Sequence, residues 1–211
     1  MRIVLVPLLA GLLVMPARTT AAELEAARQP IEALYAVLVE CLKNADELGL
    51  DGRRAKIAPA VSEGYDLPFM AKKILGRHWR TLDEASQQRW VSTFGGLTAA
   101  TYAEQMTGFT GQVFEVLKVE SSQRGTALVY SQVVTPGDDP IAINYRMRPD
   151  GESWRIIDVY LNGTVSELAL RRSEYAAVLQ RDGFEKLVAS IDAKIASGQM
   201  AGETMPASAA Q

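Results

Sequence analysis

The stretch IAINYRMRPDGESWRIIDVYL, residues 141–161, decides the fold. Apolar and polar side chains alternate on either side of an Asp-Gly pair, which is the pattern of two β-strands that each bury one face. An Asp-Gly pair between two such runs is a strong signal for a tight hairpin turn. Counting outward from that two-residue turn predicts two facing pairs, Tyr145 with Ile156 and Met147 with Trp154. The large apolar side chains of both strands then lie on one face of an antiparallel sheet.

The same alternation continues upstream of the hairpin, and helical periodicity replaces it on both sides of the sheet. Strands are expected near 112–122, 126–135, 140–148 and 152–161. Apolar side chains recur with the helical period in about 31–45, 66–75, 81–106, 164–182 and 184–195. Hairpins in series imply an antiparallel sheet. The sequence therefore predicts one α+β domain over 23–196, with a curved antiparallel sheet of about four strands wrapped by N- and C-terminal helices.

Local signals refine the helices that flank the sheet. Thr81 and Thr164 are each followed three residues later by Glu, which is the capping-box pattern of a helix start. Gly95 and Gly96 lie inside the helix expected at 81–106, where each glycine costs about 1 kcal/mol relative to Ala. A kink, or the close approach of another backbone or a ligand, would explain this pair.

The N-terminal residues 1–22 have the layout of a secretory signal peptide. A basic Arg2 precedes the uncharged stretch 3–15, and small residues around Ala22 provide a cleavage site. That stretch is shorter than the roughly 20 residues of a membrane-spanning helix, although an uncleaved anchor is the alternative. The single cysteine, Cys41, lies far from the cleavage site, so no lipid anchor is expected there. We expect a periplasmic protein without its first 22 residues, and a disordered tail at 197–211.

Composition and motifs argue against most catalytic and nucleic-acid-binding classes. The formal net charge is −3, whereas nucleic-acid binding requires a basic face. His78 is the only histidine, and the sequence has no HExxH, no paired CxxC and no phosphate-binding glycine loop. We therefore expect no catalytic residue, no metal and no cofactor other than a bound ligand. An acid–base pair of His78 with Asp66 or Asp158 is the catalytic alternative.

Two further features have a structural and a functional interpretation. Cys41 shares a helical stripe with leucines, and we expect it to be buried and unreactive. Arg171, Arg172 and Arg181 form a basic edge on a helix, which we expect to be a solvated face. A docking site for acidic headgroups or a partner is the alternative for these arginines.

Four stretches of the chain resemble a known family. They are YDLPFMAKKILGRHWRTLDEASQQRWVSTF (65–94), FEVLKVES (114–121), WRIIDVYLNGTVSELALRRSEYAAVL (154–179) and QRDGFEKLVASI (180–191). These stretches resemble the periplasmic phospholipid-binding MlaC proteins, also called the toluene-tolerance family. Within it, GRHW (76–79) and GTVSELALRRSEYAAVL (163–179) look most like the hopanoid-biosynthesis-associated, HpnM-type branch. The pair at Gly95 and Gly96 departs from what this resemblance leads us to expect.

The resemblance implies a sheet and helices that enclose a deep apolar pocket for acyl tails, with the headgroup near its mouth. It also implies a shuttle that carries lipid between an outer-membrane lipoprotein complex and an inner-membrane lipid transporter. The expected ligand is a phospholipid or a hopanoid-type lipid. The family supplies no catalytic residue to carry over. The implied lipid-binding residues are Leu67, Met70, Ile74, Leu75, Trp79, Trp90, Phe94, Tyr102, Met106, Ile143, Tyr145, Met147, Trp154 and Ile156.

Physical chemistry is compatible with such a carrier. Exposing one CH₂ group to water costs about 0.8 kcal/mol, so a tail of about 16 carbons costs on the order of 13 kcal/mol. A protein that carries lipid through water must therefore bury nearly the whole tail. Two alternatives share the same sequence features. One is a non-transporting accessory or assembly factor for hopanoid or envelope lipid complexes with a filled core, and the other is a lipid-modifying enzyme that uses His78.

Overall fold

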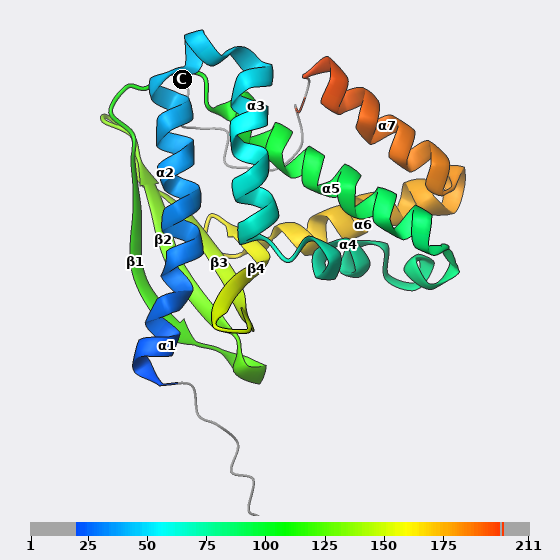
Figure 1. Ribbon diagram of the computed structural model, residues 1–211, viewed down its shortest axis with the longest axis horizontal. Helices are drawn as coiled ribbons and strands as arrows, with labels where there is room; N and C mark the ends of the chain where they lie inside the picture. Colours follow the sequence, from blue (N-terminus) through cyan, green and yellow to red (C-terminus); the bar gives the residue numbers. More distant parts are fainter. Residues whose placement is uncertain (1–19, 199, 201–211) are drawn as a thin grey trace, which may run out of the picture.

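A computed structural model describes residues 20–198 and Met200 (Figure 1). The first 19 residues of the expected signal peptide, and residues 199 and 201–211 of the expected tail, lie outside the described residues. The helices before the sheet are α1 (Ala21–Glu25), η1 (Ala26–Arg28), α2 (Gln29–Lys43), α3 (Ala45–Gly64), α4 (Leu67–Leu75), η2 (Gly76–Thr81) and α5 (Glu84–Gln105). The sheet and the helices after it are β1 (Val113–Ser121), η3 (Gln123–Gly125), β2 (Ala127–Val134), β3 (Ile141–Asp150), β4 (Ser153–Leu161), β5 (Val165–Ser166), α6 (Glu167–Asp182) and α7 (Phe184–Ser197).

The strands form one curved antiparallel sheet in the order β1-β2-β3-β4-β5. Helix α2 crosses one face of this sheet, and α3 lies beside α2 (Figure 1). Helices α4 to α7 form a second group, in which α4 packs on α6 and α7 packs on α5 and α6. The expected α+β architecture is confirmed, and the sheet has four long strands and the two-residue β5. No helix among the described residues has the length and apolar character needed to cross a bilayer.

The turn of the β3–β4 hairpin lies one residue later than expected. Asp150 pairs with Ser153, so the turn residues are Gly151 and Glu152. Of the two residues that we expected in the turn, only Gly151 has a positive φ, at 62°. This pattern fits a type II′ turn, which has Gly at its first central position and joins the strands without splaying them. The expected Asp-Gly turn was wrong because the glycine takes the first of the two central positions instead of the second.

The facing pairs of the hairpin differ accordingly. The later turn moves the register by two residues, so Met147 faces Ile156 instead of Trp154. A bulge next to Met147 moves it once more, so Tyr145 faces Val159 instead of Ile156. A two-residue shift keeps every side chain on its original face, since side chains alternate with a period of two. The further one-residue shift is taken up by Ile157, the extra residue of the bulge on β4, so Tyr145 also keeps its face. Tyr145, Met147 and Ile156 are therefore buried as expected, although with different neighbours.

Two helix starts also lie two residues beyond the expected caps. The Asp83 carboxylate accepts a hydrogen bond from a backbone N–H of α5 at 2.8 Å, and the Ser166 hydroxyl accepts one from α6 at 3.1 Å. Thr81 belongs to η2, where its hydroxyl donates to a backbone carbonyl. Thr164 lies just before β5, which pairs with β4. Each threonine is thus held by the preceding segment, and the next side chain with a free acceptor caps the helix.

Close packing explains one of the two glycines inside α5, Gly95, and nothing in the structure explains the other. A Cβ atom on Gly95 would lie 2.9 Å from Cδ1 of Leu67, and one on Gly96 would lie 3.6 Å from Cδ1 of Ile195. The first distance is shorter than a normal carbon–carbon contact. Gly95 therefore lets the start of α4 approach α5 closely, and α5 remains one continuous helix from Glu84 to Gln105.

The interpretation of the arginines at the start of α6 needs correction at one position. The Arg171 side chain is only 3 % exposed, and its Nε lies 2.8 Å from the Glu167 carboxylate. Arg171 also donates to the Tyr175 hydroxyl at 3.0 Å. Arg171 is therefore part of the interior, whereas Arg181 is exposed as expected. Cys41 is fully buried, as its place on the leucine stripe predicted, and burial raises the pKa of its thiol.

Candidate functional site

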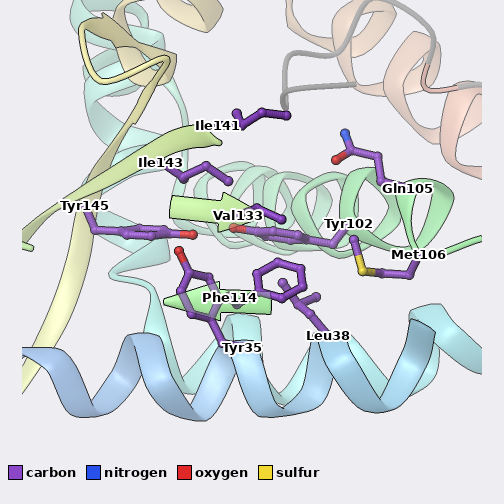
Figure 2. A pocket seen from close by; sticks show the side chains of 10 residues that line it. All are labelled: Tyr35, Leu38, Tyr102, Gln105, Met106, Phe114, Val133, Ile141, Ile143 and Tyr145. Atoms are coloured by element: carbon purple, nitrogen blue, oxygen red, sulfur yellow. The ribbon is translucent and has the colours of Figure 1, made fainter. Parts of the chain in front are cut away.

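A small apolar cavity lies between the sheet and the helices α2 and α5 (Figure 2). It measures about 20 Å³. A cavity of this size holds about one water molecule. Its lining residues come from α2, from α5 and the residue after it, and from β1, β2 and β3: Tyr35, Leu38, Tyr102, Gln105, Met106, Phe114, Val133, Ile141, Ile143 and Tyr145.

One end of this cavity carries phenolic hydroxyls. The hydroxyls of Tyr35, Tyr102 and Tyr145 point toward one another in Figure 2. The Tyr35 hydroxyl lies 2.6 Å from the Ser131 hydroxyl, and the Tyr102 hydroxyl lies 2.6 Å from that of Tyr65. We name this group of five side chains the hydroxyl cluster. All five are buried, with exposed fractions of 5 % or less.

The electrostatics of the hydroxyl cluster keep it neutral. Burial raises the pKa of Tyr35 to about 12, and it raises the pKa values of Tyr65, Tyr102 and Tyr145 well above the usual value. Phenols of this kind remain protonated at physiological pH, so each can both donate and accept a hydrogen bond. The cluster therefore offers neutral hydrogen-bonding groups and no general base.

The opposite end of the cavity lies nearer the surface. Gln105 and Ile141 are partly exposed there, and Met106 lies beside them (Figure 2). Phe114 and Leu38 form the wall between the two ends. The arrangement suits an amphiphile whose apolar part enters between the sheet and α2, with its headgroup left at the partly exposed end.

The structure distributes the fourteen expected lipid-binding residues over three places. Four line the cavity, and they are Tyr102, Met106, Ile143 and Tyr145. Two, Leu67 and Trp79, line an open groove on the outer surface. The remaining eight lie in the described hydrophobic core or at its edge and line neither space: Met70, Ile74, Leu75, Trp90, Phe94, Met147, Trp154 and Ile156.

Six lining residues of the cavity were missed from sequence. Tyr35 and Leu38 lie on the apolar stripe of α2, and Phe114 and Val133 lie on the more buried face of their strands. These patterns show which face is buried but not which part of that face borders a cavity. The sequence around Gln105 and Ile141 does not indicate a cavity, because these residues line it only where the end of α5 lies near the start of β3 in the fold.

The outer groove has a different character. It measures about 700 Å³ and is open to solvent, with α3, α4 and α5 forming its walls. Beside it, Asp66 binds the guanidinium of Arg148, which also stacks on Phe69 at 5.0 Å from the ring centre. A lipid tail in this groove would stay in contact with water along its length.

The structure does not join His78 to either candidate carboxylate. His78 is half-buried in η2, and no hydrogen bond between it and Asp66 or Asp158 is found in the described part of the chain. Asp66 caps α4 through the backbone N–H of Phe69 at 3.1 Å. Asp158 accepts a hydrogen bond from the Ser166 hydroxyl at 2.8 Å, and burial raises its pKa. Among residues 20–198 and Met200, no cluster of His, Cys, Asp or Glu could hold a metal ion.

Comparison with known proteins agrees with this architecture. A phospholipid-binding protein from Ralstonia solanacearum, solved in complex with a phospholipid, has a similar fold with a TM-score of 0.70. The two sequences are 20 % identical, and the alignment covers 82 % of this chain and 98 % of the other. The search of curated proteins found no match. The family model described as "MlaC protein" matches residues 33–193. Because that match covers most of the sequence and the fold agrees with it, this chain belongs to the MlaC family.

Proposed function

We propose that this chain is a periplasmic lipid carrier that holds lipid tails in the cavity between α2, α5 and the sheet. The observation that carries the proposal is this apolar cavity in the fold of an MlaC-family protein. The similar Ralstonia solanacearum protein was solved with a phospholipid, which supports the same ligand class here. A hopanoid-type lipid is the second ligand that we propose, because of the resemblance of 76–79 and 163–179 to that branch.

Loading of a tail requires the cavity to expand. A space of about 20 Å³ has room for about one water and not for an acyl chain. The sheet and α2 must therefore move apart, and the Tyr35–Ser131 hydrogen bond that joins them must adapt. Burial of about 16 carbons contributes on the order of 13 kcal/mol, which is large enough to offset the loss of such contacts. The outer groove is the weaker candidate, because it would leave a tail exposed to water.

Release and location complete the proposal. A tail held this strongly does not leave unaided, and the sequence has no nucleotide-binding motif, so we propose that membrane partners drive loading and release. These partners would be an inner-membrane lipid transporter and an outer-membrane lipoprotein complex.

The proposed location is the periplasm. The MlaC family is periplasmic, and residues 1–22 have the layout of an export signal. Mass spectrometry of the protein recovered from the periplasm should find an N-terminus near Glu23, and an intact residue 1–15 segment would contradict this.

Lipid that copurifies with the protein provides the direct test. The wild-type protein should release phospholipid or hopanoid-type lipid on solvent extraction, whereas Ile141→Glu should retain at least about tenfold less, since a carboxylate against the tail disfavours burial. Ile141 lines the cavity but is partly exposed, so the variant should fold. Leu117→Glu is the matched control, because Leu117 is 53 % exposed on β1 and does not line the cavity.

Two results would contradict the assignment of the cavity. Wild-type protein that carries no lipid would favour the accessory or assembly factor. Equal lipid content in Ile141→Glu and Leu117→Glu, with circular dichroism spectra like the wild type, would move the lipid away from this cavity.

We also propose that the chain is not an enzyme. His78→Ala should keep the lipid content of the wild type and should complement a deletion strain, because Asp66 and Asp158 are engaged with other partners. The measurements are lipid extraction and growth under envelope stress. A His78→Ala protein that folds, binds lipid and yet fails to complement would favour the lipid-modifying enzyme.

A further inference from the structure

The hydroxyl cluster leaves one buried group without a regular partner. Tyr145 is fully buried, and no hydrogen bond of ordinary geometry to its hydroxyl is found among the described residues. Its hydroxyl has only weak hydrogen-bond contacts with those of Tyr35 and Tyr102, and it points into the space between them (Figure 2). Native proteins rarely leave a buried hydroxyl with weak contacts alone, because its desolvation is then only partly compensated.

The hydrogen-bond directions in the cluster show what that space can accept. The Ser131 hydroxyl donates its only proton to the carbonyl of Ile143. In the 2.6 Å contact between Tyr35 and Ser131, Tyr35 must therefore be the donor. The Tyr35 oxygen is left as an acceptor, while Tyr145 retains a proton to donate. A group placed between them satisfies both only if it donates and accepts at once, as a hydroxyl does.

The position of the cluster relates it to the carried lipid. It lies at the closed end of the cavity, away from the partly exposed Gln105 and Ile141. A lipid with its headgroup at the mouth therefore brings the far part of its apolar body to the Tyr145 hydroxyl. An unmodified acyl tail places a methyl group there and leaves the Tyr145 hydroxyl with its weak tyrosine contacts alone. None of the described residues that line this cavity is Lys, Arg or His, so a charged group would be disfavoured.

We propose that Tyr145, with Tyr35, selects lipids that carry a neutral hydroxyl on the buried part of the molecule, remote from the headgroup. This inference rests on the proposed carrier function and narrows its ligand class. Tyr145 is a specificity-determining residue in this view, and the hydroxyl cluster is a polar site inside an otherwise apolar cavity.

The test compares matched probes on the full-length mature protein after removal of lipid. Palmitate and a series of hydroxypalmitates, with the hydroxyl at successive positions along the tail up to the ω carbon, compete with a fluorescent fatty acid. For at least one position of the hydroxyl on the tail, Tyr145→Phe should bind the hydroxypalmitate about tenfold or more weakly than the wild type does, with both affinities expressed relative to palmitate. Affinity for palmitate itself should be unchanged or higher, because Phe removes the weakly bonded hydroxyl. Tyr130→Phe is the control, since Tyr130 is a partly exposed tyrosine of β2 outside the cavity.

The outcomes separate this inference from the proposed function. An equal ratio of hydroxypalmitate affinity to palmitate affinity in Tyr145→Phe, Tyr130→Phe and the wild type would overturn the inference alone. The hydroxyl cluster would then be a structural group that binds water. Failure of the wild-type protein to bind any probe would overturn the carrier function, and the inference with it. A ratio that falls only in Tyr145→Phe supports both.

Discussion

Replacing Trp90 with Ala is expected to lower the free energy of unfolding by about 3–5 kcal/mol. Trp90 is completely buried in α5, and its indole N–H donates to the carbonyl of Ala71 at 3.0 Å. Its ring also meets Tyr175 and Phe184 edge-on, with centroid separations of 5.8 and 6.4 Å. The substitution removes these contacts between four helices at once and leaves a large cavity, which the surrounding helices can fill only in part.

Urea denaturation followed by circular dichroism measures this loss. Trp79→Ala is the matched control, because Trp79 lies in η2 at the outer groove and is only half-buried. The control should cost no more than about 2 kcal/mol, in proportion to the smaller area it buries. Equal losses in the two variants would show that Trp90 does not join α4, α5, α6 and α7 in the way the structure indicates.

This helical group also supports the cavity from outside. Helix α5 contributes Trp90 to the group near one end, and Tyr102 and Gln105 to the cavity near the other. Helix α5 also packs on α3, and α3 packs on α2, so we expect the sheet to move away from α2 when a tail enters. The close contact at Gly95 belongs to the interface of α5 with α4. This packing is compatible with a cavity that expands on the side of the sheet.

Periodicity predicted the elements of this fold but not their exact pairing. The alternation in 141–161 was enough to predict β3 and β4 and the buried faces of Tyr145 and Met147. The register failed because the Asp-Gly pair permits two positions for the turn, and local sequence does not distinguish them. The bulge opposite Met147 adds Ile157 to β4, where two consecutive apolar residues, Ile156 and Ile157, interrupt the alternation. Counting outward from the turn did not use this interruption.

The candidate site was less predictable than the fold, for a physical reason. Trp90 and Ile156 were expected at the pocket because they are large and apolar, yet they lie in the core. A residue that lines a cavity and one that fills the core have the same side-chain chemistry, and only the spacing between layers distinguishes them. The hydroxyl cluster joins Tyr35 to Ser131 across 96 positions of the chain, which no local pattern reveals. Arg171 was misplaced because a helical arginine is usually solvated.

The ion pair of Arg171 with Glu167 is the basis of the second prediction with a large expected loss of stability. Glu167→Ala is expected to lower the free energy of unfolding by about 3–5 kcal/mol, because it removes one carboxylate from a buried ion pair with Arg171. The exposed fractions of the two side chains are 3 % and 8 %, so water cannot replace the lost partner. Glu167 is also the first residue of α6, where a negative charge stabilises the positive end of the helix dipole.

An exposed ion pair of the same length provides the control for Glu167→Ala. Arg89 and Glu185 lie 2.7 Å apart, with exposed side-chain fractions of 47 % and 71 %. Glu185→Ala should change the free energy of unfolding by no more than about 1 kcal/mol, because solvent screens this pair in both states. Thermal and urea denaturation of the two variants in parallel give the comparison. Equal losses of unfolding free energy in Glu167→Ala and Glu185→Ala would show that burial does not determine the contribution of the Glu167–Arg171 pair.

A double variant tests the same pair from the other side. If Glu167→Ala alone is strongly destabilised, Glu167→Met combined with Arg171→Met should recover much of the loss, since two apolar side chains leave no buried charge unpaired.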